Sequence, residues 1–154
     1  MSNDFPKQTL MPHLVVRDAA KTIELYKKAF GAEELHRSLD PSSGKIMHAT
    51  LRIGDSALLL NDEFPEMGAK APITIGGTGV SLNLNFDSAE KIDAAWKRAV
   101  DAGAKVVMPL ENQFWGGRYG IVEDSSGHRW AFHAQVENPS DDEIQKRAAQ
   151  AMKK

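Results

Sequence analysis

The chain has 154 residues, of which 42% are hydrophobic and 26% charged, as expected for one globular domain or two small fused modules. Its formal net charge of −2 lacks the basic excess of most nucleic-acid-binding proteins, so we expect no nucleic-acid partner. The absence of cysteine excludes disulfides, thiolate metal sites, iron–sulfur clusters and a cysteine nucleophile.

The apolar runs and the N-terminal residues bear on localisation. No apolar run approaches the roughly 20 residues that a membrane span needs. The first residues, MSNDFPKQ, lack the basic and then apolar pattern of a signal peptide. We therefore expect a cytoplasmic protein with no membrane partner.

The first half of the chain predicts the element order β-α-β-β-β. An apolar strand leads to a capping residue, Asp18, and to apolar residues at helical spacing that stop at Gly31. Three strands follow, the last two joined by the two-residue hairpin Gly54-Asp55. The expected strands are residues 14–16, 33–37, 45–53 and 56–61.

The second half repeats this order. Asp87 is expected to cap its helix, with Glu90 three residues later as in a capping box, and the helix stops at Gly103. Equivalent landmarks in the two halves lie roughly 69 to 73 residues apart, which predicts two βαβββ modules that differ by small insertions. The expected strands here are residues 80–86, 105–108, 118–123 and 128–134.

Two such modules predict an α+β fold in which they form a paired, mainly antiparallel, cupped sheet. Neither module alone buries a sizeable core, and their uncovered faces would together form a cavity. We expect a single domain over residues 1–138, with modules at about 9–64 and 78–136 and a linker between them, and a helical tail over 139–154. The alternative is a plain α+β sandwich with a coincidental repeat.

Five short stretches follow one another in order along the chain: PHLVVRDAA (12–20), YKKAFGAE (26–33), MHATLRIGD (47–55), FWGGRYG (114–120) and GHRW (127–130). They resemble the vicinal oxygen chelate superfamily, which includes glyoxalase I, bleomycin and fosfomycin resistance proteins and extradiol dioxygenases, and more narrowly its PhnB-like branch. The chain departs from that branch at Ser125-Ser126, where a Pro-Phe pair is usual. The resemblance covers roughly residues 9–136 and implies the glyoxalase/bleomycin resistance-like fold.

Alternation along the strands sorts the side chains into a helix-facing and a cavity-facing set. Leu10, Leu14 and Val16 are expected to face the helix in the first strand, and Trp130 and Phe132 in the last. Sheet faces open to water are also polar, so plain solvent exposure stays open as an alternative for each cavity-facing residue. The cavity-facing set comprises His13, His48, Thr50, Arg52, Asn61, Ser81, Asn83, Asn85, Arg129 and His133.

Two aromatic residues beside Gly116-Gly117 complete the candidate ligand-binding set. Trp115 and Tyr119 could supply a stacking wall at the cavity mouth, or Trp115 could be a core aromatic that fixes the loop. His36 is interpreted as a surface residue, and His128 as a structural residue that bonds the backbone of its turn.

The resemblance also implies where a metal would bind. The ligand positions of metal-using members fall on Met11, on Leu59 or Asn61, on Ser81 and on Ala131, and none of these is a histidine or carboxylate. We therefore expect no metal and no cofactor. The alternative is one divalent metal at a relocated site formed by His13, His48 and His133.

Three functions remain open. The first is a PhnB-like protein that binds a small, partly aromatic or amide-bearing molecule without a metal, as the superfamily's resistance proteins sequester a drug. The second is a glyoxalase- or dioxygenase-type enzyme that uses a displaced metal, or His13 or His48 as a general base. The third is a purely structural dimer module. In each case we expect a homodimer, because open sheet edges favour pairing.

Overall fold

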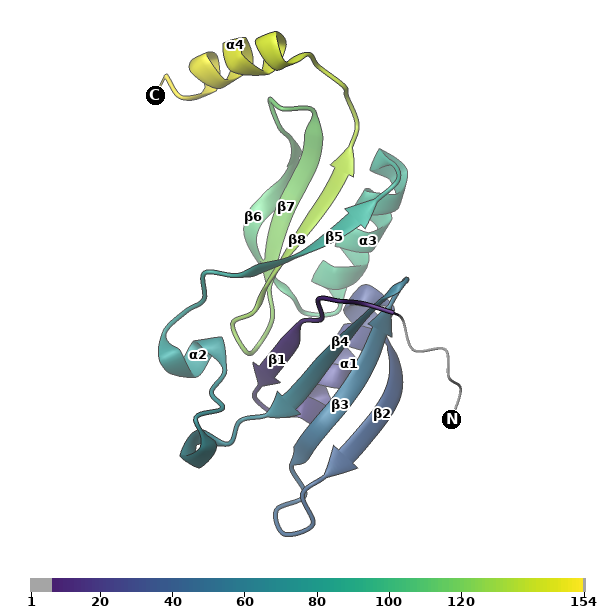
Figure 1. Cartoon of the computed structure of the whole chain (residues 1–154). Coiled ribbons are helices and arrows are strands. Elements are labelled where there is room, and N and C mark those ends of the chain that lie inside the picture. Colours follow the sequence, from purple (N-terminus) through teal and green to yellow (C-terminus); the bar gives the residue numbers. More distant parts are fainter. Residues whose placement is uncertain (1–6, 154) are drawn as a thin grey trace.

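The computed structural model describes residues 7–153, and Figure 1 shows two β-sheets, each with a helix on one side. The first module comprises β1 (His13–Val16), α1 (Ala19–Phe30), β2 (Glu33–Leu39), β3 (Ile46–Ile53) and β4 (Ser56–Asp62). The second comprises β5 (Ser81–Phe86), α3 (Ala89–Asp101), β6 (Lys105–Asn112), β7 (Gly117–Glu123) and β8 (Arg129–Gln135). Between them lie η1 (Pro65–Met67) and α2 (Pro72–Ile75), and α4 (Asp141–Ala151) follows the second module.

The two sheets have the same topology. Their strand orders are β1-β4-β3-β2 and β5-β8-β7-β6, with the β1–β4 and β5–β8 pairs parallel and the other pairs antiparallel. The predicted α+β fold with two βαβββ modules is therefore confirmed. Among residues 7–153, the outer strands β1 and β2 of the first sheet and β5 and β6 of the second each pair with one neighbour only, so each sheet keeps two open edges.

Helix capping follows the prediction in the first module but not in the second. Asp18 adopts a left-handed conformation (φ 50°) and accepts a hydrogen bond from Lys21 N, and α1 ends at Gly31 (φ 67°). In α3, Ser88 and not Asp87 is the N-cap, because Ser88 Oγ accepts the hydrogen bond from Lys91 N at 3.2 Å. Asp87 lies one residue too early and forms an ion pair with Lys91 instead.

Aromatic side chains form much of the core between the modules. Phe30 at the end of α1 lies 4.2 Å from Trp130 of β8, centroid to centroid, and Phe132 packs against Trp96 of α3 at 5.2 Å. Trp130 and Phe132 face the helices, as predicted. The prediction for Leu10 was wrong, since this residue precedes β1 and is 87% exposed.

A buried carboxylate links the two modules. Asp124, in the turn before β8, accepts hydrogen bonds from the Tyr26 hydroxyl at 2.6 Å and from Trp130 Nε1 at 3.1 Å. Its other oxygen accepts two backbone N–H groups of the turn. Burial and the adjacent Asp124 charge raise the pKa of Tyr26 well above its usual value.

Two further differences from the sequence-based expectations concern the second module. The His128 ring donates from Nε2 to the carbonyl of Val15 in β1 at 2.8 Å, so it joins the modules and does not bond the backbone of its own turn. Strand β6 extends to Asn112, beyond the predicted end at residue 108. Residues 1–6, on which the signal-peptide expectation depends, lie outside the described residues. Within residues 7–153, no helix is long and apolar enough to cross a membrane.

Candidate functional site

The first sheet presents a group of polar residues on the face opposite α1, which we call the first-sheet cluster: His13, His48, Thr50 and Asn61. The Asn61 side-chain amide donates to the carbonyl of Asp62 at 2.8 Å, which directs its oxygen toward His13. His13 Nε2 then donates to this oxygen at 2.6 Å. This bond assigns the hydrogen of His13 to Nε2 and leaves Nδ1 as an acceptor.

His48 has two other histidines as neighbours. Its ring centroid lies 6.3 Å from that of His13 and 6.1 Å from that of His36. Partial burial is the main cause that lowers the pKa of His48 below its usual value, and the proximity of these two rings lowers this pKa further. His36 is exposed, as expected, but its position near His48 was missed because it depends on the pairing of β2 with β3.

Two other predicted residues of this sheet have protein partners. Thr50 is only 2% exposed, and its hydroxyl lies 3.3 Å from His48 Nε2, so it can orient that ring but offers little surface to a ligand. Arg52 forms an ion pair with Glu33 on the neighbouring strand at 2.6 Å.

The second sheet carries a group of stacked rings, which we call the aromatic platform: Trp115, Tyr119 and His133. The Trp115 and His133 rings are stacked, with centroids 5.4 Å apart and planes inclined by 26°. Tyr119 meets Trp115 edge-on at 5.8 Å. A Cβ at Gly117 would lie 1.8 Å from the indole, so the ring reaches this position only because residue 117 is glycine.

Two asparagines of β5 continue the platform toward the sheet edge, and we call them the amide pair: Asn83 and Asn85. Asn85 Oδ1 accepts from Asn83 Nδ2 at 2.7 Å and from His133 Nδ1 at 3.3 Å. His133 Nε2 is therefore an acceptor. Both asparagines are exposed, so Asn85 Nδ2 and Asn83 Oδ1 are available to a planar amide.

The remaining predicted residues of this sheet lie farther from the rings. Ser81 and Arg129 are register partners on the exposed face, and Arg129 contacts Glu123 at 3.6 Å. Glu111 was not identified from the sequence, yet it is exposed and lies directly opposite Tyr119. Glu111 was missed because the sequence predicted that strand β6 would end at residue 108, before Glu111.

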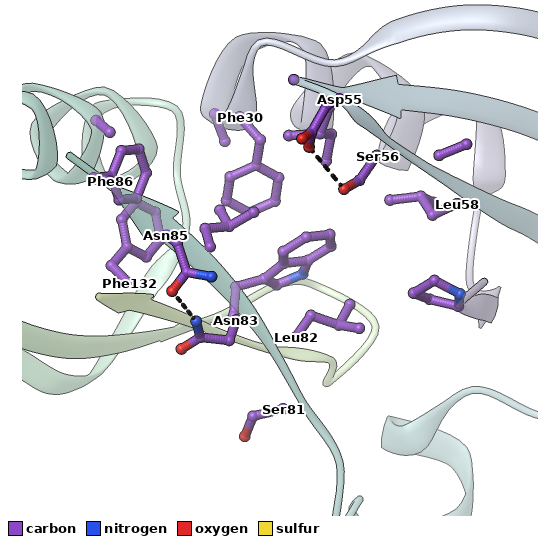
Figure 2. A pocket seen from close by; sticks show the side chains of 18 of the residues that line it. Phe30, Asp55, Ser56, Leu58, Ser81, Leu82, Asn83, Asn85, Phe86 and Phe132 are labelled. Atoms are coloured by element: carbon purple, nitrogen blue, oxygen red, sulfur yellow. Dashed lines mark hydrogen bonds between the residues drawn. The ribbon is translucent and has the colours of Figure 1, made fainter. Parts of the chain in front are cut away.

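A groove of about 790 Å³ runs between the modules along β5. Figure 2 shows it between Phe30 and Leu58 of the first module and Leu82 of β5. Residues of helices α1 and α3 also line this groove, so the groove opens mainly on the apolar side of the sheets that faces the helices. Of the predicted ligand-binding residues, only Ser81, Asn83 and Asn85 belong to its lining.

The structure thus divides the predicted site into two separate groups. Among residues 7–153, no hydrogen bond or ring contact joins the first-sheet cluster to the aromatic platform. Ligand binding by the candidate set of both sheets stays a prediction.

The residues do not fit the metal site that the superfamily resemblance implies. Met11, Leu59 and Ala131 offer no hard donor, and Asn61 is already bonded to His13. Within the part of the chain that the structure describes, no three His, Asp or Glu side chains are grouped so as to hold a metal ion.

Comparison with known proteins agrees with this fold. An uncharacterised protein of Mycobacterium bovis, Mb0911c, is 48% identical over 139 residues, which are 88% of this chain and 89% of the relative. Among solved structures, PA1353 from Pseudomonas aeruginosa has a TM-score of 0.67 at 26% identity, covering 84% of this chain and 98% of its own. A PhnB protein from Bacillus cereus has a TM-score of 0.63 at 19% identity, covering 82% and 99%.

A family profile gives the assignment. The profile described as the Glyoxalase/Bleomycin resistance protein/Dioxygenase superfamily matches residues 8–132, which include both βαβββ modules. Together with the duplicated sheet topology, this match shows that the chain belongs to the glyoxalase/bleomycin resistance protein/dioxygenase superfamily.

Proposed function

We propose that the chain is a PhnB-like protein that binds a small planar molecule bearing an amide or a similar polar group, without the metal used by other members of its superfamily. The ligand would stack on the aromatic platform and exchange hydrogen bonds with the amide pair. The observation that carries the proposal is the Trp115–His133 stack beside two exposed asparagine amides.

The chemistry of this surface supports a planar ligand. Trp115 is half-buried, so its ring has a fixed orientation while part of it meets solvent. A ring fixed in this way loses little conformational freedom on binding. The amide pair presents a donor and an acceptor at the edge of the platform, which matches the donor and acceptor of a carboxamide.

We propose in addition that the protein is a homodimer. The open edge of β5 borders the apolar groove, in which Leu82, Leu84 and Phe86 are only half-buried. A second chain would cover this apolar surface, which is unfavourable in water. It could also place a polar face opposite the aromatic platform. Among the described residues, the first-sheet cluster of the same chain does not contact this platform.

The binding proposal is tested with two compounds of similar size. Benzamide has a planar ring, whereas cyclohexanecarboxamide keeps the amide and lacks the ring. Titration followed by NMR should show benzamide shifting the Trp115 indole and His133 ring signals at millimolar concentration, with at least threefold weaker binding of the cyclohexane compound. Equal binding of the two, or no change at Trp115, would contradict the proposal.

Proton transfer is a second candidate, favoured by the geometry of His13. The Asn61 bond holds the Nε2–H tautomer, so Nδ1 can accept a proton from a bound molecule. The lowered pKa of His48 keeps that ring neutral and able to act as a base over a wider pH range. Loss of a measured turnover in both His13→Asn and His48→Gln, with ligand binding retained, would favour this function.

A further inference from the structure

Helix α4 packs only lightly, with its apolar residues Ile144 and Ala148 half-buried. None of its side chains over residues 141–151, all of them described, is buried. Ser140 caps it by accepting from Glu143 N at 3.2 Å. Among the described residues, one central arginine makes all the side-chain hydrogen bonds that α4 donates to the rest of the chain.

Arg147 is that residue. Its Nη1 and Nη2 donate to the two oxygens of Glu137 at 3.0 and 2.7 Å, and its Nε donates to Glu143 at 3.1 Å. The hydrogen bonds that Arg147 donates to Glu137 raise the pKa of Arg147 and lower the pKa of Glu137. A fork of this kind fixes the direction of the guanidinium, which a single contact would not.

The same guanidinium also reaches the loop of the aromatic platform. Arg147 Nη1 lies 3.3 Å from the carbonyl oxygen of Phe114, the residue before Trp115. The carbonyl of Gly116, the residue after it, accepts from the backbone N–H groups of Val136 and Glu137, both at 3.0 Å. Both neighbours of Trp115 are therefore bonded to residues 136–151, which we call the C-terminal arm.

Close packing reinforces this attachment. A Cβ at Gly116 would lie 2.6 Å from Pro139 Cδ and 2.7 Å from the Glu137 carbonyl oxygen. Gly116 also has φ of 95°, which disfavours other residues. The loop and the C-terminal arm therefore fit together without space between them at the point where the Trp115 ring turns onto the sheet.

We propose that Arg147 is a positioning residue, and that the C-terminal arm holds Trp115 stacked on His133 and thereby sets the surface of the aromatic platform. In this arrangement α4 contributes little to the stability of the domain. It orders a loop whose own backbone hydrogen bonds among the described residues are those of a tight turn, from Gln113 N to Gly117 O and from Gly116 N to Gln113 O. The part of this inference that concerns ligand affinity rests on the function proposed above.

The test uses the full chain labelled with 5-fluorotryptophan and ¹⁹F NMR, with Arg147→Gln as the variant and Lys146→Gln as its control. Lys146 is the preceding residue of the same helix and is exposed. We expect the Trp115 resonance to move toward the free amino acid and to broaden in Arg147→Gln, while those of Trp96 and Trp130 stay in place. Lys146→Gln should match the unmodified chain.

A second variant, Glu137→Gln, and hydrogen exchange test the same role of Arg147 independently. Glu137→Gln removes the charge that Arg147 pairs with and should change the Trp115 signal in the same direction, even if Arg147→Gln does not fold. Hydrogen exchange of α4 shows whether the helix has detached. A detached helix with an unchanged Trp115 resonance would overturn the inference.

Benzamide titration then separates this inference from the proposed function. If benzamide binds the unmodified chain, we expect roughly three- to tenfold weaker binding to Arg147→Gln, because a less ordered ring must be ordered again on binding. Equal affinity with a displaced Trp115 signal would support the positioning role of Arg147 and count against the proposed stacking of the ligand on Trp115. Failure of benzamide to bind the unmodified chain would count against the proposed function, while the ¹⁹F result would still decide the role of Arg147.

Discussion

Removing the Tyr26 hydroxyl tests how the two modules are held together. Tyr26 is fully buried, and its hydroxyl donates to the Asp124 carboxylate across the boundary between α1 and the second module. A buried hydrogen bond to a charged group contributes about 1.5–3 kcal/mol. Tyr26→Phe keeps the ring that packs on Phe30 and Trp130, so we expect a loss of about 2 kcal/mol in the free energy of unfolding.

Urea unfolding followed by tryptophan fluorescence measures this loss, and thermal unfolding should show a decrease of about 4–8 °C in Tm. The matched control is Tyr119→Phe, whose hydroxyl has no hydrogen-bond partner among the described residues, and a change within about 0.5 kcal/mol is expected. Equal changes in stability for the two substitutions would refute a role of the Tyr26–Asp124 bond in holding the modules together.

Three other predictions concern the first sheet and the assembly. NMR titration should give His48 a pKa below the usual 6.5, and His13→Asn should raise this pKa. Because the folded state disfavours protonated His48, the free energy of unfolding should fall slightly as the pH drops from about 6.5 to that lower pKa. An unchanged His48 titration in His13→Asn would contradict this. Sedimentation at micromolar concentration should show a dimer, and a species of about 16.9 kDa alone would exclude it. Elemental analysis of protein purified without a histidine tag should find no stoichiometric Zn, Fe, Mn or Ni, whereas one equivalent would favour the enzyme alternative.

The local order of elements could be predicted because each depends on neighbouring residues. Alternation of apolar and polar residues identified the strands, and Gly31 and the Gly54-Asp55 hairpin ended elements where expected. The N-cap of α3 was misassigned because Asp87 and Ser88 are both good caps, and only backbone conformation separates them.

The site was harder to predict because it depends on register and on contacts between distant residues. Parity correctly grouped His48 with Asn61 and Asn85 with His133, since a face is shared by alternate residues. It could not show that Thr50 is covered. It also could not show that the two polar groups make no contact with each other among the described residues, because the angle between the modules is not encoded in any strand pattern.

The most direct measurement of the central claim is a crystal structure of the protein with benzamide, supported by the binding constants of the unmodified chain and Trp115→Leu. We predict the benzamide ring stacked on Trp115, its amide bonded to Asn83 or Asn85, and at least fivefold weaker binding to Trp115→Leu, since stacking on a fixed aromatic ring contributes about 1 kcal/mol or more. Benzamide seated instead in the apolar groove beside Phe30 and Leu82, with affinity unaffected by Trp115→Leu, would contradict the claim.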